Sequence, residues 1–171
     1  MGRDRKNENR QEHFTKMVRN MMQTDAWRAL SPTAQALYPW LKFEWHGPKA
    51  NNNGKIRLSV RQAADCLGCS KHLASKAFHD LQAKGFIVQT KAACLGSHGE
   101  ATSPEYEITE ISLPMREKGQ HGRCLYLNWK LGYDFPVHKS QPNNPRGHNA
   151  TLPHNRKSDD VVIPLRGKAR D

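Results

Sequence analysis

Residues 66–87, CLGCSKHLASKAFHDLQAKGFI, decide the fold of this chain. Gly68 is suited to end one helix and Ser70 to cap the next, so the stretch predicts a helix from Lys71 to about Lys84, which Gly85 ends. At about 100° per residue, the sides of that helix separate small or apolar residues from polar ones. The first set is Ala74, Ala77, Phe78 and Leu81, and the second is His72, Ser75, Lys76 and His79. The helix is therefore predicted to bury one face and to present donors and cations on the other.

The segment before the turn predicts a second, shorter helix. Ser59 is placed to cap residues 60–67, VRQAADCL, whose buried side is formed by Val60, Ala63, Ala64 and Leu67. Only about two residues separate this helix from the next one, which is the spacing of a tight helix-turn-helix.

The cysteines in this stretch raise one alternative. Cys66, Cys69 and His72 have the spacing C-x2-C-x2-H, which is compatible with a structural zinc site. A fourth ligand would have to come from Cys94 or Cys124 elsewhere in the chain, and coordination would turn His72 off the polar face. We therefore interpret Cys69 as a small apolar plug between the helices and expect no metal.

The flanking sequence predicts a helix and three strands. Ser31 and Pro32 start a helix that ends near His46, and strands are predicted over 55–59, 86–93 and 104–111, with a Gly-containing loop over 94–103. In the last strand Tyr106 and Ile108 point inward and alternate with Glu105 and Glu107. The order of elements predicts an α+β fold, a winged helix-turn-helix with a three-helix core and a small antiparallel β wing over residues 14–113.

The rest of the chain divides into arms and one segment of open assignment. Residues 1–13 and 136–171 lack periodicity and are predicted to be a disordered N-terminal arm and a disordered basic tail. In residues 114–135, Leu125, Leu127 and Trp129 alternate, so this segment is either an extra strand or a segment that packs over the core. Near the N-terminus, Met17, Met21 and Met22 recur at helical spacing and indicate core or a dimer surface.

The charge of the chain lies mostly in these arms. The formal net charge of the 171 residues is +11. Lys and Arg outnumber Asp and Glu by six to three in residues 1–19, by ten to eight in residues 20–113 and by eleven to five in residues 114–171. A nearly neutral module with basic ends suits docking on a polyanion, whereas the plainer alternative is a tail that only confers solubility.

No targeting segment is recognised. No stretch approaches the ~18 uninterrupted apolar residues of a membrane helix, and residues 1–14, MGRDRKNENRQEHF, lack the apolar core of a signal peptide. We therefore expect a cytoplasmic, nucleoid-associated protein with no membrane contact, in which the four cysteines are reduced thiols.

Three stretches carry a family resemblance: DAWRALSPTAQALY at 25–38, residues 52–87 from NNGKIRLS to the Phe86-Ile87 pair, and ATSPEYEIT at 101–109. Over residues 14–112 the chain resembles the winged-helix proteins of plasmids, integrative elements and prophages, which include the N-terminal domains of replication initiators and phage replisome organisers. The family pattern is matched in the turn by Gly68 and Ser70, and at the end of the second helix by Leu81, Gly85 and Phe86. The sequence departs from it at Cys69, where a branched aliphatic residue is usual, and at His98, where the wing tip often has Arg or Lys.

The resulting hypothesis is a sequence-specific binder of double-stranded DNA. The helix from Lys71 to Lys84 would enter the major groove, and the loop at 94–103 would touch the neighbouring backbone. The predicted DNA-binding residues are Arg57, Arg61, Ser70, Lys71, His72, Ser75, Lys76, His79, Lys91 and His98. The resemblance implies a task in transcription or in origin recognition on a mobile element, and we expect a homodimer and no cofactor.

A protein-interaction module is the alternative from another class. In that case a winged helix would dock a partner through the tail or through its apolar run VVIPL at 161–165. An enzyme is not expected, because His148 and His154 lie in Pro- and Asn-rich sequence that would not hold a ligand still.

Overall fold

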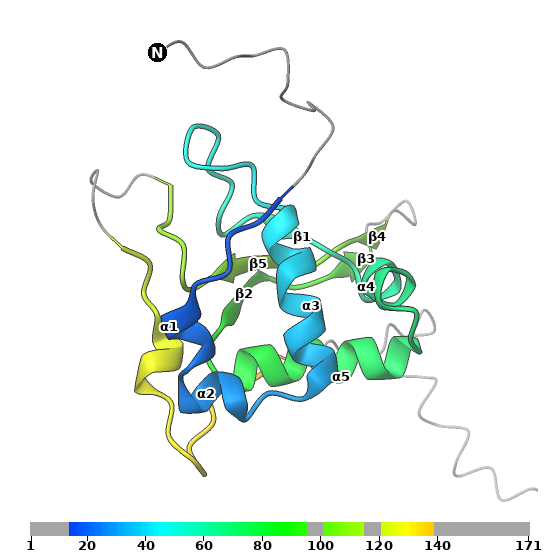
Figure 1. Ribbon diagram of the computed structural model, residues 1–171. Helices are drawn as coiled ribbons and strands as arrows, with labels where there is room; N and C mark the ends of the chain where they lie inside the picture. Colours follow the sequence, from blue (N-terminus) through cyan, green and yellow to red (C-terminus); the bar gives the residue numbers. More distant parts are fainter. Residues whose placement is uncertain (1–13, 96–100, 115–120, 139–171) are drawn as a thin grey trace, which may run out of the picture. The chain divides into compact units, whose positions relative to one another are not determined.

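Two helices joined by a short turn, α4 (Val60–Leu67) and α5 (Lys71–Ala83), lie side by side in the computed structural model, which describes residues 14–95, 101–114 and 121–138 (Figure 1). The first, α4, begins with a capping box between Ser59 and Gln62 and ends at Gly68, whose φ of 60° suits a residue without Cβ. The second, α5, is capped by the Ser70 hydroxyl, which accepts a hydrogen bond from the Leu73 amide at 3.2 Å. Both predicted helices and both predicted caps are confirmed.

The other elements make the fold a mixed α+β one, as predicted. They are α1 (Arg19–Met22), α2 (Asp25–Arg28), α3 (Pro32–Phe43), β1 (Ile56–Arg57), β2 (Ile87–Lys91), β3 (Cys94–Leu95), β4 (Ala101–Thr102), β5 (Glu105–Ile108) and the 3-10 helix η1 (Leu125–Asn128). In the described part of the chain, no helix is long and apolar enough to cross a membrane.

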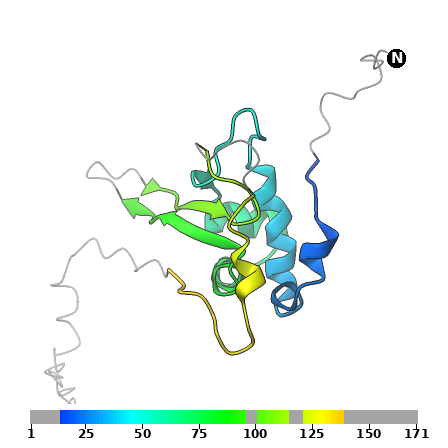
Figure 2. The same cartoon turned by 90° about the vertical axis from the view of Figure 1, so that its left-hand side faces the viewer.

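The strands form a small antiparallel sheet of order β1-β5-β2, in which Ile56 and Gln89 both lie opposite Tyr106. Helices α3, α4 and α5 pack against one another, and α5 also contacts β2. Beyond the sheet, β3 pairs with β4, so the two ends of the predicted loop at 94–103 are strands rather than loop. Figure 2 shows this hairpin extending from the sheet away from α3.

The central strand β5 is buried on both sides, which the alternating pattern did not predict. Tyr106 and Ile108 are buried as expected, but Glu105 and Glu107 are also buried. Each carboxylate has an arginine partner: Arg57 Nε lies 3.0 Å from Glu105, and Arg123 Nε lies 2.8 Å from Glu107. A buried charge is tolerated only when it is paired, and these two ion pairs supply that condition.

Residues 121–138 pack over the core, and no strand forms from Leu125 to Trp129. Tyr126 stacks on Phe86 with ring centroids 4.9 Å apart, and Trp129 is buried. The Cys124 amide donates to the Thr109 carbonyl at 2.8 Å, which anchors the segment at the end of β5. The alternation of leucines was misleading, because the 3-10 helix η1 leaves Leu127 64% exposed.

The N-terminal methionines do not form the common surface that was suggested for a dimer. The chain is helical only from Arg19, and Thr24 caps a second turn with its hydroxyl accepting from the Trp27 amide at 3.2 Å. Met21 is 2% exposed and belongs to the core, whereas Met22 is exposed. A dimer surface that includes Met21 is therefore wrong, since its side chain is already enclosed.

Candidate nucleic-acid interface

Helix α5 presents the two faces that the sequence predicted. Ala74, Ala77, Phe78 and Leu81 are all buried, so the small and apolar side packs inward. On the other side Lys71, His72 and Lys76 are exposed, and Ser75 and His79 are half-buried. The orientation on which the hypothesis depends is therefore confirmed.

The carboxylate of α5 points to a different partner. Asp80 Oδ2 accepts a hydrogen bond from the Ser31 amide at 2.7 Å, just before α3 begins. A carboxylate near a helix N-terminus also interacts favourably with the backbone dipoles there. Asp80 thus links α5 to the start of α3, and it leaves the exposed face of α5 with donors and cations only.

Two further predicted cations lie on elements that contact α5, and two other predicted residues differ from them. Arg61 on α4 and Lys91 at the end of β2 are exposed, and neither is paired with another residue in the described ranges. Arg57, by contrast, is paired with Glu105, and this guanidinium holds the pKa of the Glu105 carboxyl below its ordinary value. His98, the predicted contact at the wing tip, lies outside the described residues.

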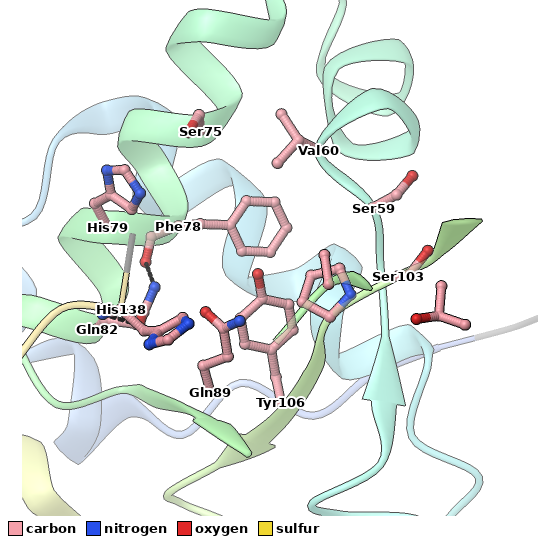
Figure 3. Close-up of a pocket in the computed structure, with 13 residues that line it drawn as sticks. Ser59, Val60, Ser75, Phe78, His79, Gln82, Gln89, Ser103, Tyr106 and His138 are labelled. Atoms are coloured by element: carbon pink, nitrogen blue, oxygen red, sulfur yellow. Dashed lines mark hydrogen bonds between the residues drawn. The ribbon is translucent and has the colours of Figure 1, made fainter. Parts of the chain in front are cut away.

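A pocket of about 340 Å³ opens beside the polar face of α5. We call it the α5 pocket. Ser75 and His79 line it from α5, and Ser103 lines it from the chain between β4 and β5 (Figure 3). Phe78 and Tyr106 form its apolar floor, with ring centroids 5.1 Å apart and planes 15° from parallel.

Cys66 and Cys69, two of the residues with zinc-ligand spacing, lie in different surroundings. Cys66 is exposed on α4, and Cys69 is half-buried and packs against the core in the turn between the two helices, the position predicted for an apolar plug. Among the described residues no three His, Cys, Asp or Glu side chains are grouped as metal ligands would be.

In comparisons with protein families, with characterised proteins and with solved structures, nothing matched this chain. What the surface binds is therefore inferred from its own geometry and charge. The most informative features are the polar face of α5, two cations on elements that contact α5 and have no ion-pair partner among the described residues, and the adjoining pocket.

Sequence reasoning missed a short strap, residues 134–138, that fastens the chain to the end of α5. The Phe135 amide donates to the Ala83 carbonyl at 2.9 Å, and the His138 amide donates to Gln82 Oε1 at 3.0 Å. Asp134 accepts from Lys84 Nζ at 2.9 Å and from Trp129 Nε1 at 2.8 Å. The apolar Phe135 was a weak local signal, because the partners on and next to α5 lie 50 or more residues earlier in the chain and only Trp129 is near in sequence.

The strap predicts a pH-dependent contribution to stability. Hydrogen bonds from Lys84 and Trp129 hold the pKa of Asp134 below its ordinary value. A carboxyl whose folded pKa is lowered stabilises the fold above its unfolded pKa, and this contribution is lost as the pH falls through the folded value. We expect Asp134→Asn to cost less than about 1 kcal/mol at neutral pH, because the carboxylate is exposed.

The measurement is urea unfolding of wild type and Asp134→Asn, followed by tryptophan fluorescence. The difference in unfolding free energy should shrink as the pH is lowered from about 6 to about 3. A difference that is constant over this range would show that the Asp134 carboxylate does not stabilise the strap.

Proposed function

We propose that this protein is a winged helix-turn-helix binder of double-stranded DNA that reads sequence with α5. The α4-turn-α5 unit, the small antiparallel sheet and the β3–β4 hairpin have the order and the pairing that such a fold requires. The observation that carries the proposal is the exposed face of α5, where Lys71, His72 and Lys76 stand together without a carboxylate.

The roles of the residues follow from what each part of DNA offers. Lysine donates to guanine O6 and N7 in the major groove, so Lys76, near the middle of the exposed face, is assigned to base contact. Arg61 and Lys91, on elements that contact α5, are assigned to phosphates, together with Lys71 at the helix N-terminus, where backbone amides also favour an anion. The pairing of Arg57 with Glu105 makes it the weakest of the predicted phosphate ligands.

The biological task that we propose is transcriptional regulation or origin recognition on a mobile element, by a nucleoid-associated protein that catalyses no reaction. This rests on the resemblance noted from the sequence and on the fold order. One recognition helix reads only a few base pairs, so two copies on a two-fold site would raise both affinity and specificity. Recovering and sequencing the genomic fragments that the purified protein retains would identify the site.

Separate substitutions on α5 and α4 test the assignment. We expect Lys76→Ala to cost about 1–3 kcal/mol on the preferred duplex and to relax base preference. Arg61→Ala should weaken preferred and random duplexes alike, because phosphates carry no sequence information. Fluorescence anisotropy with both duplexes measures this. Equal losses on the two duplexes for Lys76→Ala would show that α5 does not read bases.

A protein-interaction module is the second candidate, and one observation favours it. Leu127, Leu131 and Tyr133 are between 64% and 86% exposed, which is unusual for three large apolar side chains so close in sequence. A gel shift with random duplex at moderate salt separates the two candidates. The module predicts no retardation, whereas the DNA-binding proposal predicts retardation that weakens as salt is raised.

A further inference from the structure

The Tyr106 hydroxyl reaches the α5 pocket without a hydrogen-bond partner among the described residues. Tyr106 is 3% exposed, and Figure 3 shows its ring below Phe78 with the hydroxyl directed into the pocket. Burial raises the pKa of Tyr106, so the hydroxyl keeps its proton at neutral pH and is available as a donor. No side-chain nitrogen or oxygen of the described residues is both fully buried and without a partner, so this hydroxyl oxygen is open to the pocket rather than enclosed.

Other polar groups around the pocket are also free to bind. Gln89 donates its amide N–H to the Lys91 carbonyl at 3.2 Å, and its carbonyl oxygen bonds to no residue that the structure describes. The hydroxyls of Ser75 and Ser103 are likewise without a partner in the described ranges. The pocket thus offers both donors and acceptors above an apolar floor.

The lining also restricts the charge and size of what it can hold. No Asp, Glu, Lys or Arg side chain lines the described part of the pocket, so neither a strong anion nor a strong cation is matched there. A volume of about 340 Å³ lies at the lower end of the range for small-molecule sites. A small, uncharged ring with apolar faces and polar edges meets these conditions.

We infer that the α5 pocket binds one purine or pyrimidine base, with the Tyr106 hydroxyl hydrogen-bonded to its edge. The base belongs either to a free nucleoside or to bound DNA from which it is unstacked, and only the second source rests on the proposed function. Ser75 lines the pocket from the same face of α5 that carries Lys76. The pocket therefore adjoins the face that is proposed to contact DNA bases.

The first arm of the test uses free ligand. The full-length protein is titrated separately with deoxyadenosine, deoxyguanosine, deoxycytidine and thymidine, and binding is followed by saturation-transfer NMR. Tyr106→Phe should weaken binding of the preferred nucleoside about three- to tenfold, the usual effect of one lost hydrogen bond. Its melting temperature should not fall, since no described protein group bonds to that hydroxyl. Tyr133→Phe, which removes an exposed hydroxyl elsewhere, is the matched control.

The second arm uses DNA. Duplexes from the genomic pull-down, with 2-aminopurine at successive positions, should show a rise in fluorescence at one position when an unstacked base enters the pocket. Tyr106→Phe should reduce that rise, and Tyr133→Phe should not.

The outcomes separate the two sources and the two proposals. Binding in the first arm alone assigns the pocket to a free nucleoside, and a signal in the second arm alone assigns it to a base of bound DNA. The inference is overturned if neither arm responds, or if Tyr106→Phe behaves like wild type in both. Failure to bind any duplex would remove the proposed function, and the nucleoside arm would still decide the pocket.

Discussion

Replacing Lys42 with methionine should destabilise the protein by about 3 kcal/mol, because it leaves the largely buried Glu110 carboxylate without its cation. Lys42 is 6% exposed, and its ammonium lies 2.8 Å from Glu110 Oε2. The same ammonium donates to the Lys16 carbonyl at 2.6 Å and so holds the N-terminal segment on α3. After the substitution, the hydrogen bond from the Tyr38 hydroxyl, at 2.9 Å, remains to stabilise Glu110.

A double-mutant cycle gives this prediction a sharp control. Lys42→Met combined with Glu110→Leu should be more stable than Lys42→Met alone, since the second change removes the orphaned charge. Urea unfolding of the four proteins measures the coupling. If Lys42→Met stayed within about 0.5 kcal/mol of wild type, the pair would behave as an exposed ion pair and the buried arrangement would be refuted.

Removing the three cations assigned to phosphates should have the largest effect on DNA binding. With Arg61, Lys71 and Lys91 all changed to alanine, we expect affinity for duplex DNA to fall about 100-fold at moderate salt. The slope of log affinity against log salt should also fall by about 3, one for each lost phosphate contact. Because the three side chains are exposed, the melting temperature should change little.

The matched control removes the same charge elsewhere. Arg28, Lys49 and Lys130 are exposed as well, and none of them lies on α4, α5 or the β3–β4 hairpin. A triple alanine variant at these positions should keep most of the affinity and most of the salt slope. If the two triple variants lost affinity equally, binding would depend on net charge alone and the proposed interface would be wrong.

Local sequence was sufficient to predict the two helices of the helix-turn-helix segment, α4 and α5. Ser59 and Ser70 cap their helices as predicted, and Gly68 adopts the left-handed conformation that favours glycine. The buried and exposed faces of α5 were also predictable, because the 3.6-residue period of a helix can be recognised from the order of apolar and polar residues within the helix itself. These signals need no knowledge of the rest of the chain.

What the sequence did not show depends on distant partners. The alternation in β5 predicted one solvent-exposed face of the strand. Glu105 and Glu107 are instead buried, and each is paired with an arginine, 48 and 16 residues away in the chain respectively. The loop after α3 read as featureless polar sequence, yet the Asn53 side chain is buried and bonds to both the amide and the carbonyl of Ile108. The α5 pocket likewise arises from elements that meet only in the folded chain.

The late position of residues 121–138 sets an order of events during synthesis. When β5 has left the ribosome, Arg123, which pairs with Glu107, and Tyr126, which covers Phe86, have not. At ~5–20 residues per second, roughly two to six seconds pass before residue 138 follows. During that interval the nascent chain exposes an aromatic surface and an unpaired carboxylate, and it is then a substrate for chaperones and proteases that the finished protein is not.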